Sequence, residues 1–253
     1  MSADAVFGGA GGLIGRGVDV ITCVVRGRVD VRETIRLTDV GVREVLGTAV
    51  AGAIVIGGIV GLQGLSYLTR YNASEVFGWA AALSAFRDVG PVLLAFAIAA
   101  RLGTQNSADT AASAARERID ALCALGLDPL RVVIAPRVCA VTLTALLLYP
   151  PCAALMLFVA FVFALALGGQ PVAVSWWSVV TYIGAGVLWE GLGRMALFGV
   201  VIGTATTHAG LSLWLSDRRA ARDIGAAVYD GSVTSVIAIS VVNGALSLAG
   251  GTG

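Results

Sequence analysis

The stretch "RERIDALCALGLDPLRVVIAPR", residues 116 to 137, differs sharply from the chain around it. It carries seven charged residues and two prolines, whereas only 13% of the 253-residue chain is charged and 57% is hydrophobic. The mean hydropathy of the chain, +0.87, is higher than a water-soluble domain needs for its core. The composition therefore predicts an all-α integral membrane protein, in which the charged stretch separates two membrane spans.

The beginning of this stretch has the pattern of a short amphipathic helix over about residues 116–128. Ile119 and Leu122 lie on one apolar face, because residues three apart are neighbours on a helix. Glu117 and Asp120 have the same spacing and form an adjoining acidic face. A helix of this kind, held between two spans, is suited either to docking on a cytosolic partner or to lying on the lipid headgroups.

A stop signal marks the end of the helix. Gly126 can adopt the left-handed conformation that commonly ends a helix. Asp128 and Pro129 follow, and the residue before a proline is disfavoured in the helical conformation. The helix is therefore expected to be short and to have a fixed direction.

Five apolar stretches are long enough to cross a bilayer. The clearest is an uncharged run of 25 residues, Val45 to Thr69, whereas a hydrocarbon core of about 30 Å needs roughly 20 residues. In the second stretch, Asp88 is expected to cap a helix that has Pro91 in its first turn. The third contains Pro150-Pro151 and is predicted to be one kinked helix rather than two spans. The predicted ranges are 45–69, 88–109, 138–167, 187–208 and 232–249.

The basic residues predict the orientation. All 17 of them are arginines, and thirteen fall before residue 45, in residues 110–137 or in residues 209–227. Five spans with a cytoplasmic N-terminus place all three segments in the cytoplasm, as the positive-inside rule expects. The protein is thus expected to be a multi-pass membrane protein with a cytoplasmic N-terminus and an external C-terminus. Three tryptophans then fall near the outer interface: Trp79, Trp176 and Trp177.

The first 44 residues do not have the composition of a span. They mix Val, Ile and Leu with frequent Arg and Asp, which is typical of an amphipathic helix on the inner leaflet. The expected organisation is therefore an N-terminal interfacial helical segment, residues 1–44, followed by a transmembrane domain, residues 45–253.

Several kinds of chemistry are excluded or disfavoured by what the sequence lacks. A net charge of +1 gives no reason to expect a nucleic-acid partner. A Walker A loop requires a lysine, which this chain lacks, so the chain cannot itself be a P-loop ATPase. The four cysteines have no paired spacing, which favours free thiols over a disulfide or a metal site. No catalytic residue, metal or cofactor is expected in this chain.

A segment of about 50 residues, beginning at "FRDVGPV" (86–92), resembles the MlaE/YrbE permease family. Members of that family are the membrane subunits of ATP-binding-cassette lipid transporters that work with MCE-domain proteins. The family pattern includes F-R-E-L-G-P-V, G-R-V-G, T-E-Q-I-D-A-L, M-G-I-D-P and V-P-R. The matching residues are Phe86-Arg87-Asp88-Val89-Gly90-Pro91-Val92, Ala100-Arg101-Leu102-Gly103, Glu117-Arg118-Ile119-Asp120-Ala121-Leu122, Gly126-Leu127-Asp128-Pro129 and Ala135-Pro136-Arg137.

The chain also departs from the family pattern. Asp109 replaces the glutamate of A-E-L-G, and Arg194 stands where a lysine is usual. Cys123 replaces the acid of L-E-V-M-G. Such drift resembles a diverged permease that pairs with a more typical sister, as in actinobacterial Mce systems.

The resemblance implies a role for the charged stretch and a set of partners. Residues 116–128 would form the coupling helix that docks into a groove of a cytosolic ATPase dimer, and that dimer would use ATP and Mg. Further implied partners are a second permease (a sister or an identical chain), MCE-domain proteins and membrane lipids, with no nucleic acid. The residues expected to take part in coupling are Glu117, Arg118, Ile119, Asp120, Leu122, Gly126, Asp128 and Pro129.

Polar and ionisable residues inside spans are candidates for the substrate path, because burying them in a membrane is costly. Arg101 and Asp109 are two turns apart on one helix, hence near one face, and Gln105 lies between them. Glu190 and Arg194 are four residues apart and are expected either to line the path or only to neutralise each other. Two G-x-x-x-G patterns are predicted to be helix-packing seams: Gly57 with Gly61, and Gly199 with Gly203.

The expected function is that of the permease subunit of an MCE lipid transporter, driven by a separate ATPase. Its substrate would be a hydrophobic lipid of the fatty acid, sterol or phospholipid class, moved across or out of the inner membrane. One alternative is an ion-coupled carrier that uses Asp109 and Arg101, although five spans without detectable inverted repeats argue against it. Another alternative is a structural membrane anchor for an MCE assembly.

Overall fold

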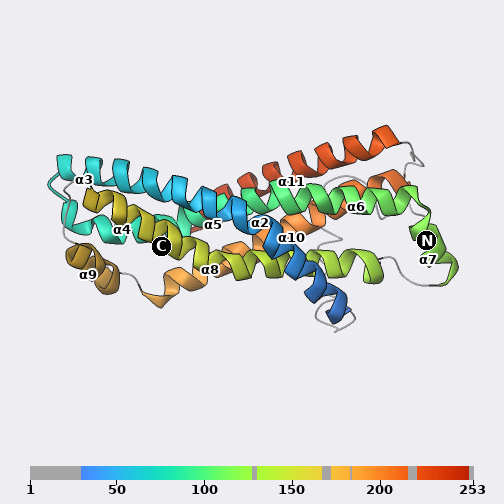
Figure 1. The fold of residues 1–253 in the computed structure, drawn as a ribbon, viewed down its shortest axis with the longest axis horizontal. Coiled ribbons are helices and arrows are strands. Elements are labelled where there is room, and N and C mark those ends of the chain that lie inside the picture. Colours follow the sequence, from blue (N-terminus) through green and yellow to red (C-terminus); the bar gives the residue numbers. More distant parts are fainter. Residues whose placement is uncertain (1–29, 127–129, 167–171, 183, 216–220, 251–253) are drawn as a thin grey trace. The chain divides into compact units, whose positions relative to one another are not determined.

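The computed structural model describes residues 30–126, 130–166, 172–182, 184–215 and 221–250, and all regular elements among them are helices (Figure 1). Short π or 3-10 segments are labelled η. The elements are α2 (Val31–Ile59), η2 (Val60–Gly64), α3 (Leu65–Arg70), η3 (Ser74–Val76), α4 (Phe77–Leu83), η4 (Ser84–Asp88), α5 (Val89–Ile98), η5 (Ala99–Gly103), α6 (Thr104–Ala115), α7 (Arg118–Ala124), η6 (Leu130–Ile134), α8 (Ala135–Ala166), α9 (Val172–Tyr182), α10 (Ala185–Leu215) and α11 (Ala221–Gly250).

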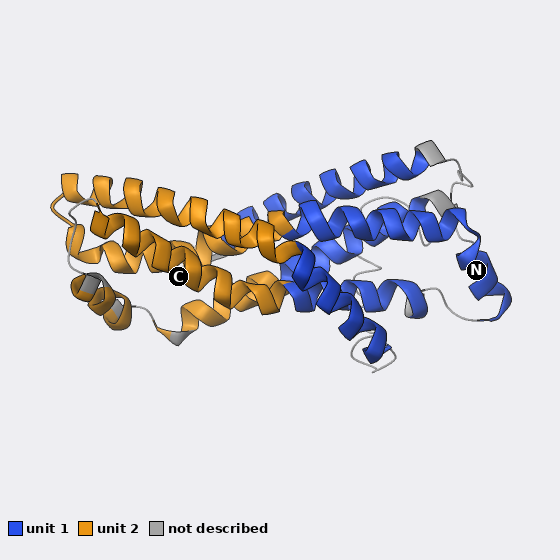
Figure 2. Ribbon diagram, viewed as in Figure 1, with its two compact units in different colours: residues 1–44, 98–144, 197–253 blue, residues 45–97, 145–196 orange. Residues whose placement is uncertain are grey.

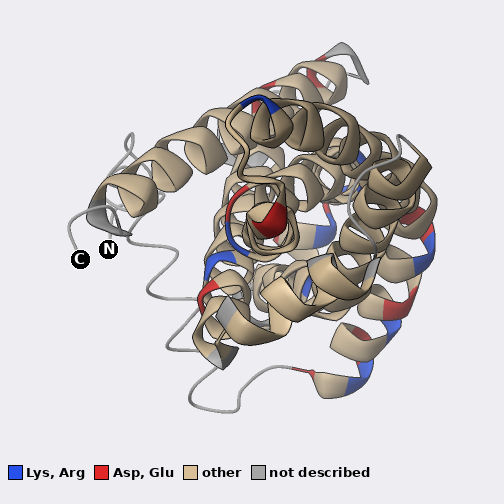
Figure 3. Cartoon of the chain, turned by 90° about the vertical axis from the view of Figure 1, so that its left-hand side faces the viewer, with Lys and Arg blue, Asp and Glu red and all other residues tan. Residues whose placement is uncertain are grey.

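Five helical stretches of the described chain are long and apolar enough to cross a membrane, which confirms the predicted number. Each begins before its predicted range, and the first, second and fourth also end beyond it. Charged residues occupy a small part of the ribbon (Figure 3). The candidate spans are Val31–Arg70, Ser74–Ala115, Val132–Ala166, Gly186–Ser212 and Asp223–Leu248.

The third span is a single helix, as predicted. Pro150 and Pro151 both lie inside α8, which continues unbroken for 32 residues. A proline removes one backbone hydrogen bond of a helix and crowds the preceding turn. In a membrane span the neighbouring turns still satisfy their own backbone groups, so the helix can continue past the prolines.

The second span differs from its prediction at Asp88. This residue does not cap a helix; it lies inside the continuous helical stretch from Ser74 to Ala115. The five residues before α5 form the π turn η4, and the backbone N–H of Val89 bonds to the carbonyl of Ser84, five residues back. A π turn widens the helix where Pro91 needs room for its ring, so the proline no longer requires a helix start.

The N-terminal part of α2 belongs to the first span's helix. Asp30 caps it, because one carboxylate oxygen accepts the backbone N–H groups of Arg32 at 3.1 Å and Glu33 at 3.4 Å. The helix then runs from Val31 through residue 45, so the predicted boundary between an interfacial segment and the transmembrane domain is not a break in the helix. Residues 1–29 lie outside the described part of the chain.

The sequence did not predict the short helix α9. It carries Trp176 and Trp177, which are 56% and 71% exposed, as interfacial tryptophans often are. The helix packs against α4, where the Ser178 hydroxyl accepts the backbone N–H of Trp79 at 3.1 Å.

The helices group into two compact units (Figure 2). In the unit formed by residues 45–97 and 145–196, the core contains Phe77, Met156 and Phe161. The predicted seam at Gly57 and Gly61 lies here. A side chain at Gly57 would come within 2.5 Å of the carbonyl oxygen of Met156, and one at Gly61 within 2.6 Å of that of Ala160. The two glycines therefore let α2 and η2 approach α8 closely, as predicted.

The other unit is formed by residues 1–44, 98–144 and 197–253 (Figure 2). It contains the second predicted seam, at Gly199 and Gly203 of α10. An added Cβ would lie 2.6 Å from the Cα of Thr142 at Gly199 and 2.9 Å from the Cα of Val138 at Gly203. Both positions therefore pack backbone against backbone on α8, which confirms this seam as well.

Candidate functional site

Two ion pairs join the π turn η4 to α10. The Arg87 side chain, Nε, lies 3.2 Å from Glu190 Oε2, and Arg194 Nη1 lies 3.7 Å from Asp88 Oδ1. Two adjacent residues of η4, one basic and one acidic, thus pair with one acidic and one basic residue of α10. The Arg194 side chain is only 9% exposed, whereas the carboxylates of Asp88 and Glu190 are about half exposed.

This arrangement corrects the predicted pair of Glu190 with Arg194. The two residues are four apart, but each has its ion pair with the neighbouring helix. Helical spacing brings residues four apart near each other, but it does not exclude a pair with an oppositely charged residue on a facing helix. The four charges together form a cross-helix cluster: Arg87, Asp88, Glu190 and Arg194.

Packing next to this cluster fixes the same helix contact. The Tyr149 hydroxyl of α8 donates to the backbone carbonyl of Phe86, in η4. Gly191 of α10 leaves the space that the tyrosine ring fills, since a side chain there would overlap the Tyr149 hydroxyl. Three helical segments, η4, α8 and α10, therefore meet at this polar cluster.

The other unit buries a row of polar residues of α6. Asn106, Ser107 and Thr110 are at most 7% exposed. The Asn106 amide donates to the Thr206 hydroxyl at 3.1 Å, and the Ser107 hydroxyl donates to the Thr206 carbonyl at 3.1 Å. These bonds fasten α6 to α10.

Arg137 of α8 is the cation that this row holds. Its Nη1 donates to Thr110 Oγ1 at 3.1 Å and to Asn106 Oδ1 at 3.3 Å. Asp109 Oδ2 lies 4.0 Å away, and its carboxylate is 58% exposed. The ion pair that the structure gives Asp109 is therefore with Arg137 on α8. The match to the V-P-R motif had marked Arg137 in the sequence. Spacing along the chain could not identify Asp109, on another helix, as its ion-pair partner.

The remaining predicted path residues of this span have different surroundings. Arg101 lies exposed on the π turn η5. Gln105 donates through Nε2 to Glu44 Oε1 of α2 at 3.0 Å. The structure thus connects Gln105 to the first span and Asp109 to the third.

A helix is present in the stretch that was predicted to form a coupling helix, but it is shorter than predicted. Helix α7 covers Arg118–Ala124, after Glu117, which has a left-handed backbone with φ of 58°. Gly126 has φ of 73°, in agreement with the predicted helix stop. Asp128 and Pro129 lie outside the described residues.

Ile119 does not have the predicted outward orientation. Its side chain is fully buried and packs with residues of α6, η6, α8 and α10: Ala114, Ile134, Val138 and Leu211. The periodicity correctly marked Ile119 as an apolar position, but the residues that Ile119 contacts belong to this chain and not to a partner. Along α7, Glu117, Arg118 and Cys123 are exposed, Asp120 and Leu122 are partly buried, and beyond its end Leu125 is 74% exposed.

Comparison with known proteins identifies the family. The profile of the Permease MlaE family matches residues 35–249. The chain belongs to the MlaE permease family.

Individual relatives agree with this assignment. A probable ABC transporter permease protein of Synechocystis is 28% identical over 228 residues, which cover 88% of this chain and 84% of the relative. The intermembrane phospholipid transport system permease protein MlaE of Haemophilus influenzae is 38% identical over 97 residues, 38% of this chain and 37% of the relative. A probable ABC transporter permease protein of Rickettsia typhi is 27% identical over 196 residues, which cover 74% of this chain and 71% of the relative.

The match includes every side-chain cluster described above. The cross-helix cluster, the α6 row and α7 all lie within residues 35–249 of this MlaE-family permease. Five candidate spans and the family assignment together make the chain a multi-pass membrane protein.

Proposed function

We propose that this chain is the permease subunit of an ABC-type lipid transporter that works with MCE-domain proteins. Its ATP would be hydrolysed by a separate cytosolic ATPase dimer, and a second permease, a sister or an identical chain, would complete the membrane part. The observation that carries the proposal is the family match over residues 35–249. The Haemophilus relative is named for intermembrane phospholipid transport, which supports a lipid substrate of the phospholipid, fatty acid or sterol class.

Helix α7 is the proposed contact with the ATPase. It connects the second candidate span, which ends at Ala115, with the third, which begins at Val132. Because Ile119 is buried among residues of α6, η6, α8 and α10, a push on α7 reaches the ends of three spans. Ile119 therefore transmits force within the permease. The proposed contact residues are Glu117, Arg118, Asp120, Leu122 and Gly126, together with the exposed Leu125.

The substrate path is proposed to include the polar span residues Arg101, Gln105, Asp109, Glu190 and Arg194. The last two belong to the cross-helix cluster, whose carboxylates are half exposed. Of its two ion pairs, that of Arg87 with Glu190 is partly exposed on both sides and contributes little stability, so it can exchange partners as helices move. The proposed location is the inner membrane, with the N-terminus in the cytoplasm and the C-terminus outside.

A charge reversal on α7 tests this function. The double substitution Glu117→Arg and Asp120→Arg should leave membrane insertion intact, since added cytoplasmic arginines agree with the positive-inside rule. Like charges in a desolvated groove cost several kcal/mol, on the order of a hundredfold or more in affinity. The variant should therefore reach the membrane, lose the ATPase in a detergent pull-down and stop lipid transport.

A second variant removes ambiguity about folding. Leu125→Asp changes a side chain that is 74% exposed, so it disturbs little packing within the chain. It should also weaken ATPase retention, whereas Leu143→Asp, at an exposed position within the third span, should impair insertion instead. Normal ATPase retention and transport in the charge-reversal variant and in Leu125→Asp would exclude α7 as the coupling element. Transport that needs a proton gradient but no ATPase would favour the ion-coupled carrier.

A further inference from the structure

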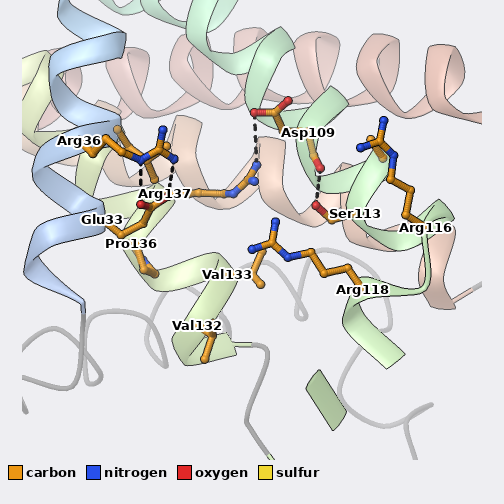
Figure 4. A pocket seen from close by; sticks show the side chains of 12 residues that line it. Glu33, Arg36, Asp109, Ser113, Arg116, Arg118, Val132, Val133, Pro136 and Arg137 are labelled. Carbon is orange, nitrogen blue, oxygen red and sulfur yellow. Dashed lines mark hydrogen bonds and ion pairs between the residues drawn. The ribbon is translucent and has the colours of Figure 1, made fainter. Parts of the chain in front are cut away.

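A cavity of about 400 Å³ opens among α2, α6, α7 and the start of α8 (Figure 4). All its lining residues belong to the unit that contains residues 98–144. Its charged lining consists of four arginines and two acids: Arg36, Arg116, Arg118, Arg137, Glu33 and Asp109. The excess of arginine over acid gives the cavity a net positive charge.

The two acids neutralise only part of this charge. Glu33 is bound by Arg36 through two contacts, at 2.6 and 2.8 Å. Asp109 lies 4.0 Å from Arg137, too far for a hydrogen bond. Arg116 and Arg118 are exposed, and in the described part of the chain neither has an acidic partner within 4.0 Å. Two guanidinium groups thus remain available for a ligand.

Arg137 is oriented by its surroundings before any ligand arrives. Its side chain is 16% exposed, and the hydrogen bonds described for it all start from Nη1. Figure 4 shows the Arg118 side chain extending toward that of Arg137. Two like-charged groups converging on one cavity favour an anion between them, and guanidinium groups suit phosphate because they donate two parallel hydrogen bonds.

The position of the cavity in the chain indicates that this anion belongs to a lipid. Its lining includes residues at the start of the first candidate span, the end of the second and the start of the third. Because consecutive spans alternate in direction, these three ends lie on one side of the membrane, beside the apolar parts of the spans. A lipid can place its headgroup there and its acyl chains along the spans, whereas a free anion has no apolar part to place.

An adjoining cavity of about 150 Å³ supports the same conclusion. It shares Arg36, Leu37, Asp109 and Arg137 with the first cavity. Its further lining is mostly apolar: Val40, Leu102, Ala140 and Val141, with Gln105 and Asn106. A charged cavity that adjoins one with a partly apolar lining matches an amphiphile with an anionic head.

We propose that these joined cavities bind an anionic lipid, with its phosphate between Arg116, Arg118 and Arg137 and the beginning of its acyl chains against Leu37 and Val40. This bound lipid connects the α7 region to the first and third spans through one headgroup. The proposal concerns binding and holds whether or not the chain transports lipid.

Native mass spectrometry of the full-length chain, purified in detergent with the subunits it retains, tests the site. Dioleoylphosphatidylglycerol is titrated against dioleoylphosphatidylcholine, which has the same acyl chains and no net charge. The unmodified chain should retain phosphatidylglycerol at concentrations that leave phosphatidylcholine unbound. The double variant Arg116→Gln and Arg118→Gln should bind phosphatidylglycerol about tenfold more weakly or worse, because two charge-assisted contacts are lost.

Two control variants separate site from charge and fold. Arg43→Gln removes an arginine of α2 that is paired with Asp39 at 2.9 Å and lines neither cavity, so it should bind as the unmodified chain does. Arg116→Lys with Arg118→Lys keeps the charge and should restore the preference for phosphatidylglycerol at least in part. Circular dichroism checks that all variants are helical.

Three results would overturn the proposal. One is unchanged phosphatidylglycerol binding in the double Gln variant. Another is displacement of the lipid by an equal concentration of inorganic phosphate, which would assign the cavity to a free anion. The third is loss of a retained partner protein with no change in lipid binding, which would assign these arginines to a protein contact. The ATPase pull-down with the double variant Glu117→Arg and Asp120→Arg is a separate measurement. Its result bears on the proposed transport function and not on lipid binding.

Discussion

At the scale of single residues, Arg137 should contribute more to stability than Asp109, its ion-pair partner. Replacing Arg137 with leucine leaves the buried Asn106 and Thr110 without the donor that they share, and an unpaired buried polar group costs about 1–3 kcal/mol. Asp109→Asn removes a carboxylate that is 58% exposed and 4.0 Å from its partner, and should cost less than about 1 kcal/mol. Thermal unfolding in detergent compares the two variants. Equal losses would show that the ion pair, and not the row of α6, holds Arg137.

The cross-helix cluster gives a second prediction for residues. Double-mutant cycles measure the coupling between two side chains. Coupling should appear for Arg87 with Glu190 and for Asp88 with Arg194, which lie 3.2 and 3.7 Å apart. It should be close to zero for Glu190 with Arg194, although their spacing on α10 would allow a pair. A dominant Glu190–Arg194 coupling would contradict the geometry.

At the scale of helices, a glycine at a helix contact should tolerate substitution much less well than one with open space beside it. Gly61→Leu places a side chain against the backbone of α8, where the nearest atom to an added Cβ is a carbonyl oxygen at 2.6 Å. Overpacking of this kind typically costs about 1–3 kcal/mol, and more where backbone must move. Gly244→Leu on α11 meets nothing within 4 Å and should be neutral. The yield of monodisperse protein after detergent extraction distinguishes the two, and a stable Gly61→Leu chain would refute the close approach.

Elements and their contacts differ in how far the sequence predicts them. Apolar stretches with few charges predicted five spans and the single helix across Pro150 and Pro151, because the cost of burying charge in lipid is a local property of the sequence. Asp88 was misplaced as a cap because a π turn can absorb Pro91 without ending the helix. Periodicity marked Ile119 as apolar but could not tell a partner's surface from the chain's own core.

The candidate site was predicted residue by residue more accurately than pair by pair. Asp109, Glu190 and Arg194 were recognised as costly charges inside spans. Their partners Arg137, Arg87 and Asp88 lie tens of residues or more away in the sequence, so helical spacing carries no information about them. The local rule of four residues therefore selected the wrong partner for Arg194.

At the scale of the whole molecule, the orientation in the membrane can be tested with single cysteines. Cys123 is exposed on α7 and serves as the internal reporter once Cys23, Cys139 and Cys152 are replaced. A membrane-impermeant maleimide added to intact cells should leave Cys123 unlabelled, and should label it after the cells are opened. In a second chain that lacks all four native cysteines, Asn72→Cys provides the external reporter. Asn72 is exposed in the turn between the first two candidate spans, so this position should react in intact cells.

A third position decides between span counts. Arg219→Cys lies outside the described residues, in the arginine-rich segment between the fourth and fifth candidate spans. With five spans and a cytoplasmic N-terminus, this segment is on the same side as α7, because an even number of crossings separates the two. It should therefore be protected in intact cells, together with Cys123, and react only after the cells are opened. Labelling of residue 219 from outside, with Cys123 protected, would require an additional crossing between α7 and the fifth span. The positive-inside rule disfavours that arrangement, because it would move three arginines across the membrane.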